Sequence, residues 1–139
     1  MIYTKQFKDF LFILGEKSVD LFNYFKVDEL HGLTKKDALK HKENSQQAYI
    51  YGMANYIPKK SGEYKFGDPG FVFINSTRLD GTYKDYTGIM HETIHISLLN
   101  NDWDINNKEE EIVSNAEIYA NDIIKFIMTI KNESWFDNL

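Results

Sequence analysis

The chain has 139 residues, of which 42% are hydrophobic and 27% are charged, values that are typical of a globular domain and exclude a disordered chain. Its formal charge of −5 disfavours direct binding to nucleic acid, and the absence of cysteine excludes disulfides and thiolate metal sites. A chain of this length is expected to form one domain, over residues 1–139. The N-terminus lacks the uncharged core of a signal peptide, and no apolar run approaches the length of a membrane span. We therefore expect a cytoplasmic protein with no membrane partner.

Apolar residues recur at spacings of three and four through the first part of the chain, with Lys and Asp between them. This period is typical of an amphipathic helix whose apolar stripe faces a core, so we predict a helix over residues 4–26. The residues of this stripe are Phe7, Phe10, Leu11, Leu14, Leu21, Phe22 and Phe25.

A turn at residues 30–32 is expected to end this N-terminal region. A short polar helix then begins after Thr34, because the sequence from Thr34 to Asp37 resembles a capping box, and it extends to about residue 42. The two histidines of this region, His31 and His41, have no partner at the spacing of metal ligands. We therefore interpret both as ordinary surface residues.

Two segments in the middle of the chain are typical of β-strands. Residues 48–57 are rich in β-forming residues and are closed by Pro58, and residues 70–75 form a compact apolar run. The polar segment between them contains Pro and Gly, which is typical of an exposed loop, so antiparallel pairing of the two strands is the simplest expectation. Together with the predicted helices, this indicates an α+β fold with an N-terminal helix and a short antiparallel sheet.

The next predicted helix, over residues 83–100, carries the sequence His91-Glu92-Thr93-Ile94-His95. Residues four apart lie on the same face of a helix, so His91 and His95 can bind one metal ion, while Glu92 projects about 100° to the side. This H-E-x-x-H pattern is typical of a zinc site in which the two histidines are ligands and the glutamate is a general base. The sequence therefore predicts a Zn²⁺ ion at His91 and His95.

Catalytic zinc requires a third protein ligand and an open position for water. The last predicted helix, over residues 108–130, begins with Glu109-Glu110-Glu111. Acidic residues in a first turn also stabilise the helix dipole, and Asn107 with Glu110 can form a capping pair, so one or two of these glutamates can be caps only. Glu111 lies at the margin of the apolar stripe, which favours it over Glu110 as the third ligand. The residues of that stripe are Ile112, Ala116, Ile123, Ile127 and Ile130.

This order of motifs resembles the gluzincin group of zinc metallopeptidases, and within it the small ImmA/IrrE-type peptidases and the minigluzincins. In those families an apolar strand that ends in Ile-Asn precedes the H-E-x-x-H helix, and a later helix carries E-x-x-A-N. Here Phe73-Ile74-Asn75, the motif itself and the segment from Glu111 to Asn115 occur in the same order. The chain departs from the pattern in two places: Thr93-Ile94 replaces a pair that commonly contains small residues, and Ser114 stands where Ala is usual.

The resemblance implies a zincin-like fold and hydrolysis of peptide bonds in a peptide or protein substrate, with a regulatory protein as one expected target. Glu92 would take a proton from water and pass it to the leaving amine. Two interpretations of Asn115, one turn after Glu111, are open: it fixes His91 or the ligand carboxylate through a hydrogen bond, or it is an ordinary polar residue on the helix margin. The strand at residues 70–75 would lie beside the motif helix as an exposed edge that aligns the substrate by strand addition.

Two other interpretations are open from the sequence. One is a non-catalytic regulatory or binding protein on a zincin-like fold, which would retain zinc weakly and would not change its behaviour when Glu92 is altered. The other is a helical interaction module in which the motif is accidental. That interpretation requires the side chains of His91 and His95 to be separated by solvent.

Overall fold

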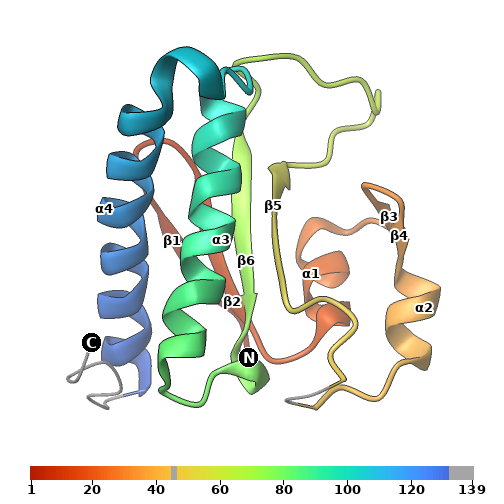
Figure 1. Cartoon of the computed structure of the whole chain (residues 1–139). Coiled ribbons are helices and arrows are strands. Elements are labelled where there is room, and N and C mark those ends of the chain that lie inside the picture. Colours follow the sequence, from red (N-terminus) through yellow and green to blue (C-terminus); the bar gives the residue numbers. More distant parts are fainter. Residues whose placement is uncertain (45–46, 132–139) are drawn as a thin grey trace.

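A computed structural model of the chain describes residues 1–44 and 47–131 and has a mixed α+β fold, as the sequence predicts (Figure 1). In chain order the elements are β1 (Tyr3–Gln6), β2 (Leu11–Gly15), α1 (Ser18–Phe25), β3 (Glu29–Leu30), β4 (Leu33–Thr34), α2 (Lys35–Lys40), β5 (Gly52–Tyr56), β6 (Gly70–Asn75), a short 3₁₀ helix (Ser76–Arg78), α3 (Tyr83–Asn100) and α4 (Ile105–Lys131).

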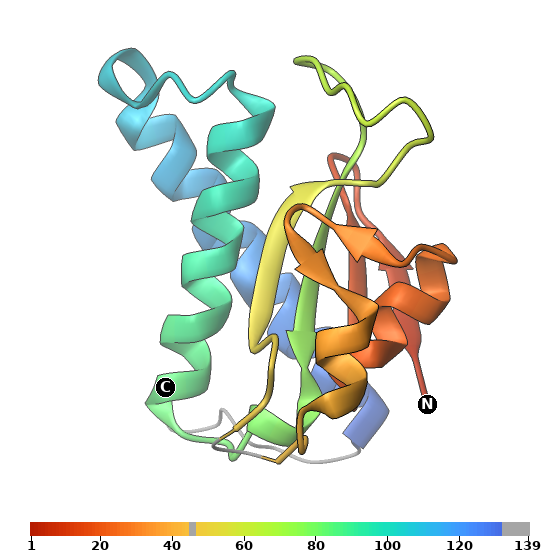
Figure 2. The same ribbon diagram turned by 90° about the vertical axis from the view of Figure 1, so that its right-hand side faces the viewer.

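The main sheet has four strands in the order β1-β2-β6-β5. β1 is antiparallel to β2, β2 is parallel to β6, and β6 is antiparallel to β5. Seen from the side, α3 and α4 lie on one face of this sheet, whereas α1, α2 and the small β3–β4 hairpin lie on the other (Figure 2). The sheet is therefore a middle layer between two helical layers.

The two central strands, β2 and β6, bury both of their faces. Successive side chains of a strand point to opposite faces, so each strand contributes to two separate apolar cores. The side chains in the core on the α3 and α4 side are Phe12, Leu14, Val72 and Ile74, and those in the opposite core are Ile13, Phe71 and Phe73.

The predicted N-terminal helix over residues 4–26 is wrong for its first half. Residues 3–15 form the hairpin of β1 and β2, and α1 occupies only the end of the predicted segment. A continuous apolar run with both faces buried suits a central strand, and periodicity alone cannot distinguish it from a helix. Gly15 at the end of β2 is consistent with a strand, because a Cβ there would lie 2.9 Å from the Phe73 ring.

The expectation that residues 70–75 form an exposed edge is also wrong. β6 is paired on both sides, with β2 and with β5, so it lies inside the sheet. This error follows from the incorrect prediction of an N-terminal helix. β2, which pairs with the second side of β6, lies within the segment that was predicted to be that helix. β5 is the edge strand on the side of the sheet nearest the motif helix.

Several predicted elements are confirmed. α3 begins and ends at the predicted residues, and β5 pairs with β6 in antiparallel orientation across the predicted loop. Thr34 caps α2 by accepting a hydrogen bond from the Asp37 N–H at 3.1 Å. The last helix begins slightly earlier than predicted, at Ile105, and is interrupted at Lys108.

None of the helices in the described part of the chain is long and apolar enough to cross a bilayer.

Candidate metal centre

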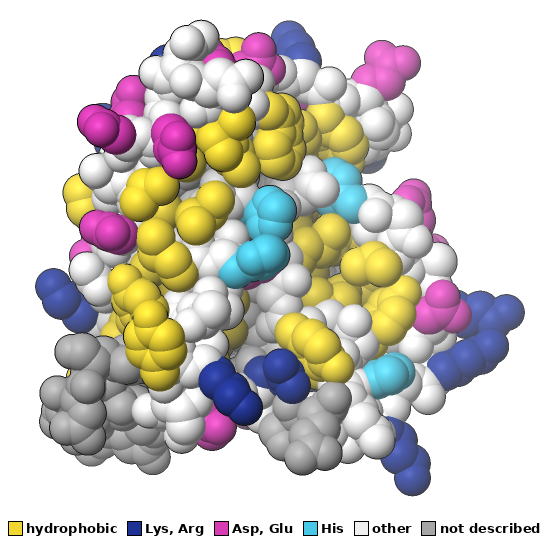
Figure 3. Space-filling view, viewed as in Figure 1, with side chains coloured by type: hydrophobic (Ala, Val, Ile, Leu, Met, Phe, Trp, Pro, Cys, Tyr) yellow, Lys and Arg dark blue, Asp and Glu magenta, His cyan; other side chains and the backbone are white. Residues whose placement is uncertain are grey.

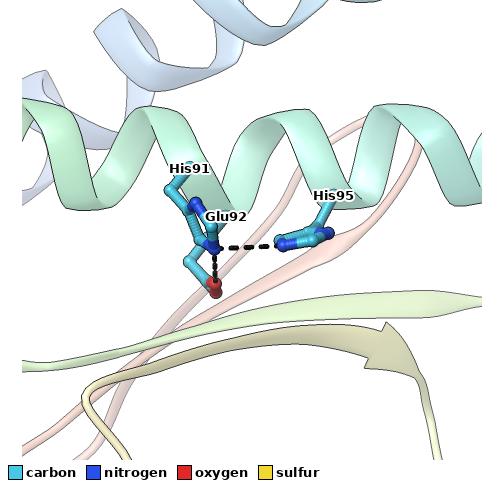
Figure 4. Close-up of side chains that lie close together, drawn as sticks. All are labelled: His91, Glu92 and His95. Atoms are coloured by element: carbon cyan, nitrogen blue, oxygen red, sulfur yellow. Dashed lines mark hydrogen bonds and ion pairs between the residues drawn. The ribbon is translucent and has the colours of Figure 1, made fainter. Parts of the chain in front are cut away.

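His91 and His95 lie one turn apart on α3, and their side chains point from the helix toward β5 (Figure 4). Their Nε2 atoms are 3.0 Å apart. A tetrahedral zinc ion with Zn–N bonds of about 2.0–2.1 Å would hold two such nitrogens roughly 3.3 Å apart. The pair is therefore close to the separation that one shared ion requires. It also contradicts the accidental-motif interpretation, which requires these two side chains to be separated by solvent.

Glu92 is buried beside the two histidines, with 7% of its surface exposed. Its Oε1 atom lies 4.0 Å from His91 Nε2, and its Oε2 atom is buried and accepts no hydrogen bond from a described residue. Burial disfavours the charged carboxylate and raises the pKa of Glu92 to about 7. The side chain can therefore exchange a proton near neutral pH, which is what a general base requires.

The same surroundings favour the form of histidine that binds metals. The pKa of His95 is lowered, first by its partial burial and second by the charge of His91 nearby. A lowered pKa keeps the imidazole of His95 neutral at neutral pH. Neutral imidazole is the form that donates a nitrogen lone pair to a metal ion.

Together, His91, Glu92 and His95 offer ligand atoms that all lie within 4.8 Å of one another. Over residues 1–44 and 47–131, no other set of three His, Asp or Glu side chains is gathered in this way. The group is positioned to hold a metal ion, in partial agreement with the predicted zinc site.

The structure does not bring Glu111 into this group. Glu111 is exposed on α4 and lines a small polar cavity together with Ser97 and Asn115. Ser97 and His95 project about 200° apart around α3, because each residue of a helix turns by about 100°. The cavity therefore lies on a different side of α3 from the histidine pair. Glu110, the alternative ligand, is also exposed and outside the group. The third ligand remains a prediction.

The other two histidines play no part in this cluster. His41 is exposed, as predicted. His31 is half-buried in the β3–β4 turn, where its Nε2 lies 2.7 Å from the carbonyl oxygen of Tyr56 and its ring packs beside Tyr64. His31 is therefore a contact between the small hairpin and β5.

β5 brings a glycine against the buried carboxylate. A Cβ placed on Gly52 would lie 3.0 Å from Cγ and 3.2 Å from Cδ of Glu92. A glycine inside a strand often marks such a close approach, so Gly52 was a signal that could have been read from the sequence. What the sequence could not indicate is that its neighbour is Glu92.

Beside the metal centre, no strand of the described residues pairs with the outer edge of β5. The Asn75 N–H donates to the Tyr51 carbonyl and the Ile57 N–H donates to the Pro69 carbonyl, each at 2.9 Å. Antiparallel strands alternate inward and outward backbone groups, so the N–H and C=O of Gly52 and Ala54 point away from β6. An unpaired edge of this kind can pair with an extended peptide.

A cavity of about 630 Å³ lies next to this edge, between β5, the 3₁₀ helix and the first turns of α3. His91 and Glu92 line one end of it, and Arg78 and Lys84 also contribute to its wall. In the space-filling view the paired histidines lie at the margin of a hollow, with basic side chains at its lower end (Figure 3). Sequence reasoning missed Arg78 and Lys84, because neither belongs to a motif.

Comparisons of the chain with protein-family models, with curated proteins and with solved structures found no match. The function must therefore be inferred from the side chains of this site and the backbone around them.

Proposed function

We propose that the protein is a zinc-dependent metallopeptidase of gluzincin type that hydrolyses peptide bonds in a peptide or protein substrate. The observation that carries this proposal is a buried carboxyl group, Glu92, next to two imidazoles whose Nε2 atoms are 3.0 Å apart on one helix face. This combination supplies both a metal clamp and a base in one place.

The donor set fits zinc in particular. The chain has no cysteine, and the site offers two imidazole nitrogens and carboxylate oxygen, which are zinc's usual nitrogen and oxygen ligands. The unpartnered buried oxygen of Glu92 also fits a site whose natural occupants are a cation and water. We retain Glu111 as the proposed third ligand. Glu92 is the alternative ligand, because it is the carboxylate that lies within reach of both imidazoles.

In this proposal zinc, when bound, polarises the scissile carbonyl and lowers the pKa of water. Glu92 takes a proton from the attacking water and delivers it to the leaving nitrogen, a task that suits its pKa of about 7. The outward N–H and C=O groups of Gly52 and Ala54 hold an extended peptide alongside the base. The substrate-aligning role that the resemblance implied for residues 70–75 thus passes to β5.

The alternative is a non-catalytic regulatory or binding protein with the same metal site. The position of Glu111 favours it, because without a third ligand from α4 the site holds two histidines and the proposed base only. A protein of this kind would bind metal and have no hydrolytic activity.

One experiment separates these two functions. Purified wild-type protein, His95→Ala and Glu92→Gln are assayed for zinc by elemental analysis and for hydrolysis of a mixture of unstructured peptides. The proposal predicts about one zinc ion per wild-type chain, which His95→Ala loses. It also predicts hydrolysis that a chelator abolishes and that Glu92→Gln slows at least ~10²-fold. Stoichiometric zinc without any hydrolysis would favour the non-catalytic protein.

A further inference from the structure

The cavity beside Glu92 has an apolar floor. Ile74 and Ile89 contribute this floor, and Leu79 closes it on the side of the 3₁₀ helix. The cavity volume of about 630 Å³ is large enough for one or more side chains of a bound peptide. Because Glu92 lines the same cavity, a group bound there would lie close to the bond that the proposed peptidase cuts.

Two basic side chains line this cavity away from the metal centre. Lys84 is exposed on the first turn of α3, and among the described residues no carboxylate forms an ion pair with it. Arg78 ends the 3₁₀ helix, and its guanidinium carbon lies 3.9 Å from the centre of the Tyr51 ring. Stacking on an aromatic ring restrains a guanidinium group at the cavity wall.

Besides Glu92, two acidic residues line the cavity, and both form hydrogen bonds with the loop that leads into α3. The Asp85 carboxylate accepts hydrogen bonds from the N–H groups of Asp80 and Gly81 at 2.9 and 2.6 Å. Asp80 in turn accepts from the N–H and the hydroxyl of Thr82 at 3.0 and 2.7 Å. These carboxylates therefore hold the loop in place, and Asp85 is buried. Arg78 and Lys84 are the Lys and Arg side chains of the cavity wall, which the exposed Asp80 carboxylate also lines.

We propose that this cavity binds a carboxylate of the substrate, and that Arg78 and Lys84 determine specificity for it. An apolar floor with cations at one end matches a short hydrocarbon stem that carries a carboxylate, as in an acidic side chain or a free C-terminus. The positive end of the α3 dipole lies at the same place and favours negative charge. This inference rests on the proposed peptidase function, since it identifies the class of peptide that the site selects.

The test uses short dansyl-labelled peptides of one uncharged sequence in which each position in turn carries Glu, Gln or Lys. Each peptide is made with a free and with an amidated C-terminus. Binding to the zinc-loaded Glu92→Gln variant is measured by fluorescence anisotropy, and cleavage by wild-type protein is measured as kcat/KM. Binding provides a readout that does not depend on catalysis.

We expect Glu at one position, or the free C-terminus, to bind about tenfold more tightly than the matched uncharged peptide, as one charge-assisted hydrogen bond predicts. Which of the two gains affinity identifies the source of the carboxylate. The preference should fall to within about twofold in Arg78→Gln/Lys84→Gln, both at exposed positions, and should persist in the control Lys36→Gln on α2.

Equal affinity for acidic, neutral and amidated peptides would overturn the inference, as would an acidic preference that the double variant retains. The outcome also separates this inference from the proposed function. Cleavage without an acidic preference would leave the peptidase standing and remove the carboxylate site. A carboxylate preference in binding, without cleavage of any peptide, would leave the site and remove the peptidase.

Discussion

At the residue scale, the site depends on a carboxyl group that is kept out of water. Glu92 is covered by β5, and its Oε2 atom has no hydrogen-bond partner among the described residues. A buried carboxyl without partners is neutralised more easily than an exposed one, because desolvation penalises its charged form. The burial that makes Glu92 a suitable base therefore destabilises the fold when the carboxyl group ionises.

The first prediction concerns this cost in the metal-free chain. The pKa of Glu92 is raised from 4.5 to about 7 by burial, so the folded chain keeps a proton that the unfolded chain loses between these pH values. By linkage, the free energy of unfolding falls as pH rises through this window and is constant above it. Over the window the loss is on the order of 3 kcal/mol.

Urea unfolding in the presence of a chelator, at pH 5 and at pH 8, measures this effect. Glu92→Gln should gain stability over wild type at pH 8 and should gain much less at pH 5. Glu117→Gln, at an exposed position on α4, is the control and should behave as wild type. The same pH dependence in wild type and Glu92→Gln would show that the carboxyl group is not buried as described.

The second prediction concerns Gly52→Ala. The added Cβ would lie 3.0 Å from Glu92 Cγ, closer than ordinary van der Waals contact, so the carboxyl group must shift. Misplacing a catalytic group by a fraction of an ångström is costly, and we expect kcat to fall at least about tenfold with zinc content unchanged. A Gly52→Ala variant that cleaves peptides at the wild-type rate would contradict the close contact between β5 and the base.

At the element scale, the arrangement of β2, β6 and β5 decides which strand can meet a substrate. β6 has partners on both sides, whereas β5, among the strands of the described residues, pairs with β6 alone. The sequence predicted both β5 and β6 because each is bounded by turn residues. It did not predict β2, because the apolar residues of β2 also fit a helical period. Pairing with β6, rather than local preference, makes this segment a strand instead of a helix.

The third prediction tests the open edge of β5 with two proline substitutions. The Ala54 N–H points away from β6, so Ala54→Pro should keep the fold and the zinc but lose a substrate contact, which lowers kcat/KM about tenfold. The Met53 N–H points toward β6, so Met53→Pro should instead lower the free energy of unfolding by roughly 1–3 kcal/mol.

Peptide cleavage and urea unfolding of both variants provide the comparison. If Ala54→Pro leaves kcat/KM unchanged while Met53→Pro behaves as expected, the substrate does not pair with β5. If Ala54→Pro unfolds the protein, the assignment of inward and outward groups on this strand is wrong.

At the scale of the whole molecule, the candidate site forms where α3 crosses the edge of the sheet. His91, Glu92 and His95 could be identified from the sequence because helical spacing is local. Glu111 could be placed on its helix but not relative to the histidines, since that depends on how α4 packs against α3. The approach of Gly52 and the cavity with Arg78 and Lys84 join segments far apart in the chain, and no local pattern indicates such contacts.

The most direct test of the proposed function compares Glu92→Gln with Glu111→Gln, each assayed for bound zinc and for peptide hydrolysis. If Glu92 is the base and Glu111 the third ligand, Glu92→Gln keeps zinc and loses at least ~10²-fold in rate, whereas Glu111→Gln loses both zinc and activity. If Glu92→Gln loses zinc while Glu111→Gln retains it, the two carboxylate roles are reversed. Normal peptide cleavage by Glu92→Gln would contradict the mechanism itself.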